Sequence, residues 1–329
     1  MEKETVLKRG DTIAVIAPSE SLKKISSIKK LAEERFLHEF GIKIKYGKNG
    51  AKTDLLGSSS ILSRIDDLHE AFKNPKIKAI ICATGGYNAN DLLPHIDWEV
   101  IRQNPKPFIG SSDITVLLNA IYAKTSITTY FSPNFYKFGM KLGFDYTIEY
   151  FKKCMMSSES YIIEKTKSWS NDKWYKNQDK RVFNNNTGYI VCQEGEAKGT
   201  IIGGNLSSLN LLQGTECMPS FDGVVLFLED DDLAGEFTFG EFNRNLQSLL
   251  QLPSAKNIMG IVLGRFPVES MMTEEKIRWL FDSKPVLRHI PIVANVDFGH
   301  TDPSCIFPIG GKAKIKIYQK NTTIEISRH

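Results

Sequence analysis

The first half of the chain alternates short apolar segments with longer segments of helical periodicity. Four of the apolar segments predict buried strands: residues 11–17, 42–46, 77–83 and 107–109. Two segments place apolar side chains on one face of a helix: residues 25–40 and 58–72. Nearly all-apolar strands separated by helices are typical of a parallel sheet that helices cover on both faces.

The second half has a different pattern. Residues 155–198 are polar and indicate an interdomain connection with long loops. Strands and one helix are predicted beyond it: strands at 224–228, 258–263, 292–296, 313–318 and 323–326, and a helix at 242–250. We therefore expect an α/β fold in which an N-terminal parallel-sheet domain (1–160) and a polar connection (161–198) precede a smaller, mixed, β-rich C-terminal domain (199–329).

Composition narrows the class of protein. A chain of 329 residues with 41% apolar and 24% charged residues is typical of a soluble two-domain protein. The net charge of +4 is spread along the sequence, which favours neither nucleic acid nor a membrane as partner. No segment approaches the roughly 20 apolar residues of a membrane span, and residues 1–9 lack the apolar run of a signal peptide. We expect a cytoplasmic protein.

The cysteines offer no chemistry of their own. There are five, isolated from one another, and no C-x-x-C pair suggests a metal or redox centre. The odd count and the expected compartment also argue against a disulfide framework. We predict neither a metal nor an organic cofactor.

The segment Gly110-Ser111-Ser112-Asp113 lies between a predicted strand and a predicted helix. A serine at such a turn exposes its hydroxyl beside the first free N–H groups of the helix, as a nucleophile with an oxyanion hole requires. A serine or aspartate here is equally an ordinary helix cap. The elbow pattern Gly-x-Ser-x-Gly is not matched, and the residues do not choose between the two serines.

Another strand end carries Gly85-Gly86. Sites on parallel sheets lie beyond the carboxyl ends of the strands. If the strands before Gly85 and Gly110 are neighbours, the glycine backbone can approach the serine turn, because no side chain blocks it. The alternative is a plain turn.

A nucleophilic serine needs a base and an acid. Of the six histidines, His300 follows a predicted strand and lies between a glycine and a polar turn, where a cleft would expose it. Four acids, residues 229–232, follow the buried strand 224–228. Such a run is either a solvated turn or the source of one half-buried carboxylate, and spacing does not choose among the four.

Assembled in this order, these segments resemble the serine peptidases of the LD-carboxypeptidase family over nearly the whole chain. The matching segments are Gly10–Ser19, Gly85–Tyr87, Ile109–Thr115, Gly203–Leu206, Leu226–Asp230 and Gly299–Pro303. The resemblance implies a Ser-Glu-His triad of Ser112, Glu229 and His300. It also implies an oxyanion hole from the N–H of Asp113 and one N–H of Gly85 or Gly86, and a homodimer.

The resemblance extends to one branch of the family. Cell-wall LD-carboxypeptidases carry an arginine before the two glycines and a glycine after the tyrosine, where this chain has Thr84 and Asn88. This version is similar to the branch of the microcin C immunity protein, which cleaves the amide between an aspartyl group and a modified nucleotide. Trp174, Asn205 and Arg244 are the substrate-binding candidates, with Trp174 offered for base stacking or loop anchoring and Arg244 for a carboxylate.

We therefore expect a serine hydrolase that cleaves a small aminoacyl-nucleotide or peptide-nucleotide conjugate. One alternative is removal of the terminal D-alanine from muropeptide tetrapeptides. A non-catalytic protein that binds a small ligand in the cleft is the alternative of another class.

Overall fold

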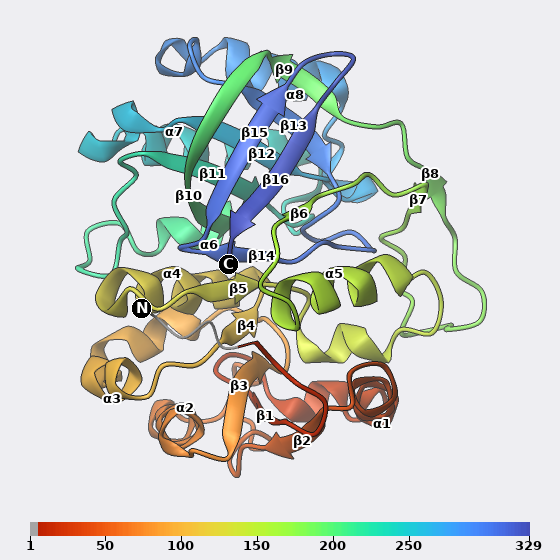
Figure 1. Ribbon diagram of the computed structural model, residues 1–329, viewed down its shortest axis with the longest axis vertical. Coiled ribbons are helices and arrows are strands. Elements are labelled where there is room, and N and C mark those ends of the chain that lie inside the picture. Colours follow the sequence, from red (N-terminus) through yellow and green to blue (C-terminus); the bar gives the residue numbers. More distant parts are fainter. Residues whose placement is uncertain (1–5) are drawn as a thin grey trace.

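The first five strands form a parallel sheet, and a strand from near the C-terminus joins its edge (Figure 1). The computed structural model describes residues 6–329. The strand order is β14-β5-β4-β3-β1-β2, in which only β14 runs antiparallel to its neighbour. The strands are β1 (Thr12–Ile16), β2 (Lys43–Tyr46), β3 (Ile77–Cys82), β4 (Phe108–Gly110), β5 (Thr129–Phe131) and β14 (Phe307–Ile309).

Helices alternate with these strands, and helical periodicity predicted those at 29–35, 61–73 and 115–125 but not the other two. The helices are α1 (Lys29–Arg35), α2 (Ile61–Lys73), α3 (Trp98–Gln103), α4 (Thr115–Thr125) and α5 (Asp145–Met155). The helix expected over 25–40 is divided: α1 begins only at Lys29, and a π-helical turn over Phe36–Phe40 ends at Gly41, whose φ is 67°. Buried Phe36 and Phe40 pack that turn against the aromatic core.

The second sheet has parallel strands at its centre and antiparallel strands outside. Its order is β6-β16-β15-β10-β11-β12-β13-β9, and β10 to β13 are parallel. The strands are β6 (Tyr161–Ile162), β9 (Ile190–Gln193), β10 (Gly195–Asn205), β11 (Val224–Glu229), β12 (Gly260–Gly264), β13 (Ile292–Val296), β15 (Lys312–Ile317) and β16 (Thr323–Arg328). The predicted α/β class, a parallel N-terminal sheet followed by a β-rich part, is confirmed.

The helices of this half are α6 (Leu206–Asn210), α7 (Thr238–Leu250) and α8 (Glu274–Asp282). Within residues 6–329, no helix combines the length and the apolar character that a membrane crossing needs.

The polar segment 161–198 forms hydrogen bonds with both halves of the chain. It supplies β6 and β9 to the second sheet, and β7 (Ser168–Trp169) pairs with β8 (Asn184–Asn185). Ser170 and Asp302 exchange two backbone hydrogen bonds of 2.8 and 2.7 Å. Because β14 lies in the first sheet, the two halves of the chain are interleaved.

Candidate active site

β4 ends in a tight turn that presents Ser112 beyond the carboxyl edge of the sheet. Ser111 is extended, whereas Ser112 has a φ of 63°, in the left-handed region that L-residues seldom adopt. A 3-10 turn over Ser112–Ile114 then leads directly into α4. The Asn134 amide holds the turn, accepting from the Ser111 N–H at 3.1 Å and donating to the Ser111 carbonyl at 3.2 Å.

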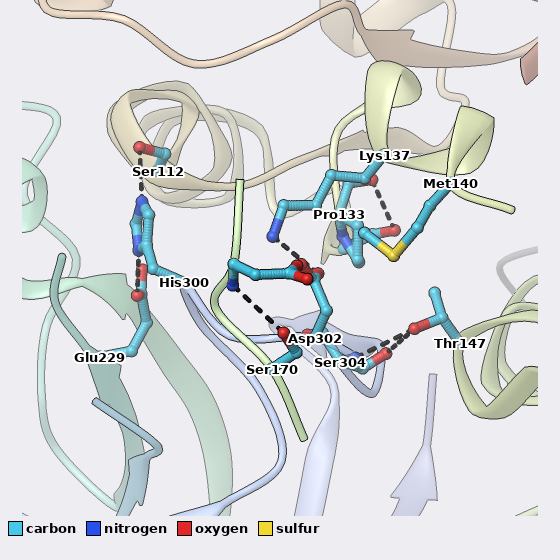
Figure 2. Close-up of polar contacts among 12 residues, drawn as sticks. Ser112, Pro133, Lys137, Met140, Thr147, Ser170, Glu229, His300, Asp302 and Ser304 are labelled. Carbon is cyan, nitrogen blue, oxygen red and sulfur yellow. Dashed lines mark hydrogen bonds and ion pairs between the residues drawn. The ribbon is translucent and has the colours of Figure 1, made fainter. Parts of the chain in front are cut away.

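The His300 imidazole links Ser112 to Glu229 (Figure 2). Its Nε2 lies 3.1 Å from the Ser112 Oγ, and its Nδ1 lies 2.6 Å from a Glu229 carboxylate oxygen. Because an ionised carboxylate only accepts hydrogen bonds, Nδ1 carries a proton, and Nε2 of the neutral ring accepts from the serine hydroxyl. A serine, histidine and carboxylate in this chain form the arrangement that activates a hydroxyl for attack on a carbonyl.

Glu229 is the last residue of β11 and is 1% exposed. Two glycines leave room for it: a Cβ on Gly264 would come within 3.0 Å of the Glu229 Cβ, and one on Gly299 within 2.9 Å of Oε2. Of the four acids in the run 229–232, the first is therefore the one whose carboxylate reaches His300. Its place as the last residue of β11 distinguishes Glu229 from the next acid, since Asp230 is buried as well.

Opposing influences set the protonation of His300. Burial lowers the pKa of the imidazole, but the Glu229 carboxylate outweighs burial and raises the pKa to about 9. Asp231 raises the pKa of His300 further, and the Lys137 ammonium lowers it. Only the neutral ring can accept the serine proton, and the fraction of neutral His300 increases as pH rises toward this value.

Gly85 lies against the serine turn. This contact was predicted on the condition that β3 and β4 are neighbours, and they pair in the sheet. A Cβ on Gly85 would stand 2.9 Å from the Ser112 Cβ and 3.0 Å from its Oγ, and 3.6 Å from the Asp113 nitrogen. Gly86 faces the other way, with its Cβ position 2.2 Å from the Ser19 Oγ. The Gly85 backbone is thus close to both the serine hydroxyl and the Asp113 N–H.

The Asp113 carboxylate is buried beneath this turn. It accepts hydrogen bonds from the Ser19 hydroxyl at 2.5 Å and from the Ala89 N–H at 2.9 Å. Burial raises the pKa of Asp113, and these hydrogen bonds oppose that shift. The side chain therefore fastens the loops that follow β1 and β3 to the serine turn.

Two cavities open on Ser112. One, of about 440 Å³, extends toward α6 and α7, and its charged lining residues are acidic: Asp113, Asp230, Asp231 and Glu241. The other, of about 210 Å³, contains His300, Gly85, Tyr136 and Lys137. A substrate can therefore extend to either side of the serine.

Asn205, a predicted contact, lines the larger cavity. Its side chain caps α6 by accepting from the Ser208 N–H, and its amide donates to Asp230 at 3.0 Å. Ser207 donates to the other Asp230 oxygen at 2.6 Å. Burial raises the pKa of Asp230 to about 6. Sequence reasoning missed Asp230 and Ser207, because an acidic run and a serine in a short helix carry no distinguishing pattern.

Two other predicted contacts lie outside both cavities. Trp174 is 3% exposed and stacks on Tyr136, with ring centroids 5.9 Å apart, so that it supports a lining residue from behind. Arg244 lies on α7 with 72% of its side chain exposed, and it pairs with Glu241 at 2.6 Å. Neither residue lines a cavity at the serine, so Arg244 is not placed to bind a substrate carboxylate there.

The structure also reveals an ion pair beside His300. The Lys137 ammonium lies 2.7 Å from an Asp302 carboxylate oxygen (Figure 2). Sequence reasoning missed this pair, because the two residues are 165 positions apart and no sequence pattern connects them.

A parallel α/β sheet with a serine turn, joined to a histidine and a buried glutamate, defines a hydrolase of the serine peptidase class. Family models match the chain twice, as the LD-carboxypeptidase N-terminal domain over residues 13–132 and as the LD-carboxypeptidase C-terminal domain over residues 198–315. The chain belongs to the LD-carboxypeptidase family, as its resemblance predicted.

Similar proteins cover almost the whole length. YocD of Bacillus subtilis, a protein with a carboxypeptidase name, is 41% identical over 98% of both chains. The crystal structure of an MccF-like protein from Bacillus anthracis is 47% identical over 98% of both chains, with a TM-score of 0.97. The microcin C7 self-immunity protein MccF of Escherichia coli is 32% identical over 96% of this chain and 93% of its own. A structure of MccF in complex with aspartyl sulfamoyl adenosine has a TM-score of 0.85, with 30% identity over 98% of both chains.

Proposed function

We propose that this protein hydrolyses an amide bond with Ser112 as nucleophile, His300 as general base and acid, and Glu229 as the group that orients the imidazole. The observation that carries the proposal is the hydrogen-bonded chain from Ser112 through His300 to Glu229, with the serine on a strained turn. The three side chains come from separate parts of the sequence and meet at one point beyond the serine turn.

Each step moves a proton through His300. Nε2 takes the proton of Ser112 as Oγ forms a bond to the carbonyl carbon, and Glu229 stabilises the resulting imidazolium. The tetrahedral intermediate collapses as the C–N bond breaks, and Nε2 returns the proton to the leaving nitrogen. Water then attacks the Ser112 ester with His300 again as base, which releases the acid and restores the serine.

We place the oxyanion beside the Asp113 N–H and the Gly85-Gly86 backbone. The short distances from the Gly85 Cβ position to Ser112 and to the Asp113 nitrogen support this placement. Backbone donors held in position before the reaction stabilise developing charge at no cost of reorganisation.

We propose an aminoacyl-nucleotide amide as substrate. The likeness to MccF, solved with aspartyl sulfamoyl adenosine, supports this class. The larger cavity supports it independently, because the carboxylates of Asp230 and Asp231 suit the α-ammonium group of an aminoacyl moiety, whereas Glu241 is already paired with Arg244. Asn205 is the proposed polar contact on that wall.

Removal of D-alanine from a muropeptide is the second candidate. The carboxypeptidase descriptions of the family models and of YocD favour it. The lining of the two cavities argues against it, because a terminal carboxylate needs a free lysine or arginine. Lys24 is paired with Glu20 and Lys137 with Asp302, and the lining residues include no other lysine or arginine.

Two parallel digests test the proposal. The wild type and Ser112→Ala are each incubated with aspartyl sulfamoyl adenosine and with a muropeptide tetrapeptide, and the products are identified by mass spectrometry. We expect aspartate and sulfamoyl adenosine from the wild type alone. Release of D-alanine from the tetrapeptide alone would assign the chain to wall-peptide trimming instead.

We further propose a homodimer, as the family resemblance implies, and a cytoplasmic location, as the sequence pattern predicts. Light scattering on a sizing column tests the assembly: a mass near twice 37.1 kDa is expected, and a mass of one chain would contradict it.

A further inference from the structure

Ser112 and His300 belong to different halves of the chain. Ser112 follows β4 in the first sheet, whereas His300 follows β13 in the second. A single hydrogen bond of 3.1 Å joins their side chains. The net contribution of one such bond to stability is small, because both groups also form hydrogen bonds with water when they are apart. Other contacts must therefore hold the segment that carries His300 at this distance.

The segment just after His300 is held from three sides (Figure 2). Ser170 pairs with the backbone of Asp302. Thr147 and Ser304 exchange hydrogen bonds of 2.8 and 3.0 Å. The third contact is the ion pair between Lys137 and Asp302, and it alone of the three involves a residue that lines a cavity at Ser112.

This ion pair is poorly exposed. The side chains of Lys137 and Asp302 are 13% and 3% exposed. Burial lowers the pKa of Lys137, but Asp302 more than offsets burial, so the pKa lies above its ordinary value and the ammonium stays charged. Asp302 stands two positions after His300, and Lys137 lies in the 3-10 turn Phe135–Gly139 that follows β5.

We propose that Lys137 is a positioning residue for the proposed Ser112–His300 pair: through Asp302 it fixes the His300 segment against the first sheet and places a positive charge beside the imidazole. The inference rests on the proposed function, because it assigns Lys137 a task only if His300 acts as the base. Lys137 itself takes no proton and forms no bond to substrate in this account.

The charge of Lys137 opposes the carboxylates around His300. Glu229 and Asp231 raise the pKa of the imidazole, and Lys137 lowers it. The same cavity is lined by Glu20, Lys24 and Asp232, of which Glu20 and Lys24 pair with each other. Loss of Lys137 would leave Asp302 as a further uncompensated carboxylate. The lost positive charge and the uncompensated carboxylate would each favour the imidazolium and reduce the fraction of neutral His300.

The rate at which a fluorophosphonate labels Ser112 tests this inference without a substrate. In this reaction Ser112 Oγ bonds to phosphorus, fluoride leaves, and His300 takes the serine proton. Labelling is followed from pH 6 to 10 in the wild type and in Lys137→Met, Lys137→Arg and Asp302→Asn. Lys141→Met is the matched control, because Lys141 pairs with exposed Asp179 outside the site. Circular dichroism checks that each variant is folded.

We expect Lys137→Met to slow labelling at pH 7 by about tenfold or more and to move the apparent pKa upward, by about one unit for each tenfold loss of neutral base. Lys137→Arg should restore rate and pKa, and Lys141→Met should change neither. Asp302→Asn, which leaves Lys137 without its carboxylate partner, should lower the labelling rate at pH 10, where the ring is mostly neutral in both proteins, while moving the apparent pKa downward. This isosteric variant remains informative if Lys137→Met does not fold.

The possible failures are distinguishable. A wild type that is not labelled at Ser112 would overturn the proposed function itself. A wild type that is labelled, with Lys137→Met and Asp302→Asn showing the same rates and apparent pKa, would overturn only the role of Lys137. Slower labelling with an unmoved pKa in both variants would reduce the pair to a structural contact and would contradict the inference.

Discussion

Ser112 adopts a backbone conformation that costs free energy, and this conformation exposes its hydroxyl. A non-glycine residue in the left-handed region is strained by about 1–3 kcal/mol and persists only where its surroundings enforce it. Here the Asn134 amide and the start of α4 hold the turn on both sides. Strain of this kind concentrates at functional sites, and it agrees with the role proposed for this serine.

The strain predicts a difference between two inactive variants. Ser112→Ala and Ser112→Gly should both lose at least about 10⁴-fold in amidase activity. Ser112→Gly should nevertheless be more stable than Ser112→Ala by about 1 kcal/mol, because glycine adopts a positive φ without strain. Urea unfolding of the two variants measures the difference. Equal stabilities would show that the turn is not strained, and full activity in either variant would end the assignment of Ser112.

The pair of His300 and Glu229 predicts the pH dependence of activity. With a His300 pKa of about 9, the neutral base is scarce at pH 7, so kcat/KM should rise with pH up to about 9. Glu229→Gln should lower kcat and shift the rising limb to lower pH, because the influence that raises the pKa is removed. If kcat/KM of Glu229→Gln rose over the same pH range as that of the wild type, this account would be contradicted.

The same shift has a consequence for stability. The folded-state pKa of His300 lies above the ordinary value of 6.5, so the protonated ring stabilises the fold fully below 6.5, and this contribution is lost as pH rises toward 9. The free energy of unfolding of the wild type should therefore fall across this interval more than that of Glu229→Gln. Chemical denaturation at several pH values measures both, and parallel curves would count against the shift.

At the scale of the element, the site depends on the close approach of two strand ends. The register of β3 and β4 brings Gly85 beside the serine turn, where any side chain would touch Ser112. This juxtaposition followed from the sequence once the two strands were taken as neighbours, because parallel strands end at one edge of a sheet. The choice of Ser112 over Ser111 did not follow from the local pattern and came only from the family resemblance, because it depends on how the turn aims each side chain at His300.

Gly85→Ala should reduce kcat by about 10²-fold or more, the scale on which loss of an oxyanion-hole donor acts. The added methyl group would meet Ser112 at 2.9 Å, and the turn must shift to admit it. Gly240→Ala is the matched control, because a Cβ there meets nothing within 4 Å in α7, and it should retain activity while gaining about 0.5–1 kcal/mol of stability. Steady-state kinetics and thermal melting report both effects, and an active Gly85→Ala would remove the backbone contact from the mechanism.

At the scale of the whole molecule, the halves are interleaved rather than joined by a linker. β14 completes the edge of the first sheet, and Asn119 on α4 donates to the Gly203 carbonyl on β10 at 2.8 Å. The sequence predicted strands of both sheets but missed β5 and β14, which have three residues each. A three-residue strand containing Pro308 has no strand signal, and it is tolerated because β14 is an edge strand. β7 and β8, within 161–198, were also missed, because each has only two residues.

Interleaving predicts that the first half does not fold alone. A fragment of residues 1–198 lacks β14 and the partner of Asn119, so it should show little cooperative unfolding, whereas the whole chain should unfold in one transition. Circular dichroism during thermal melting compares the two. A fragment that melts cooperatively at the temperature of the whole chain would show that the halves are independent domains.

The most direct test of the account identifies the residue that reacts. The protein is treated with a fluorophosphonate, digested, and mapped by tandem mass spectrometry in the wild type, Ser111→Ala, Ser112→Ala and His300→Ala. The account predicts one adduct, on Ser112, which persists in Ser111→Ala and is lost or strongly reduced in Ser112→Ala and His300→Ala. An adduct on another residue, or none in the folded wild type, would contradict the claim that Ser112, His300 and Glu229 form a catalytic unit.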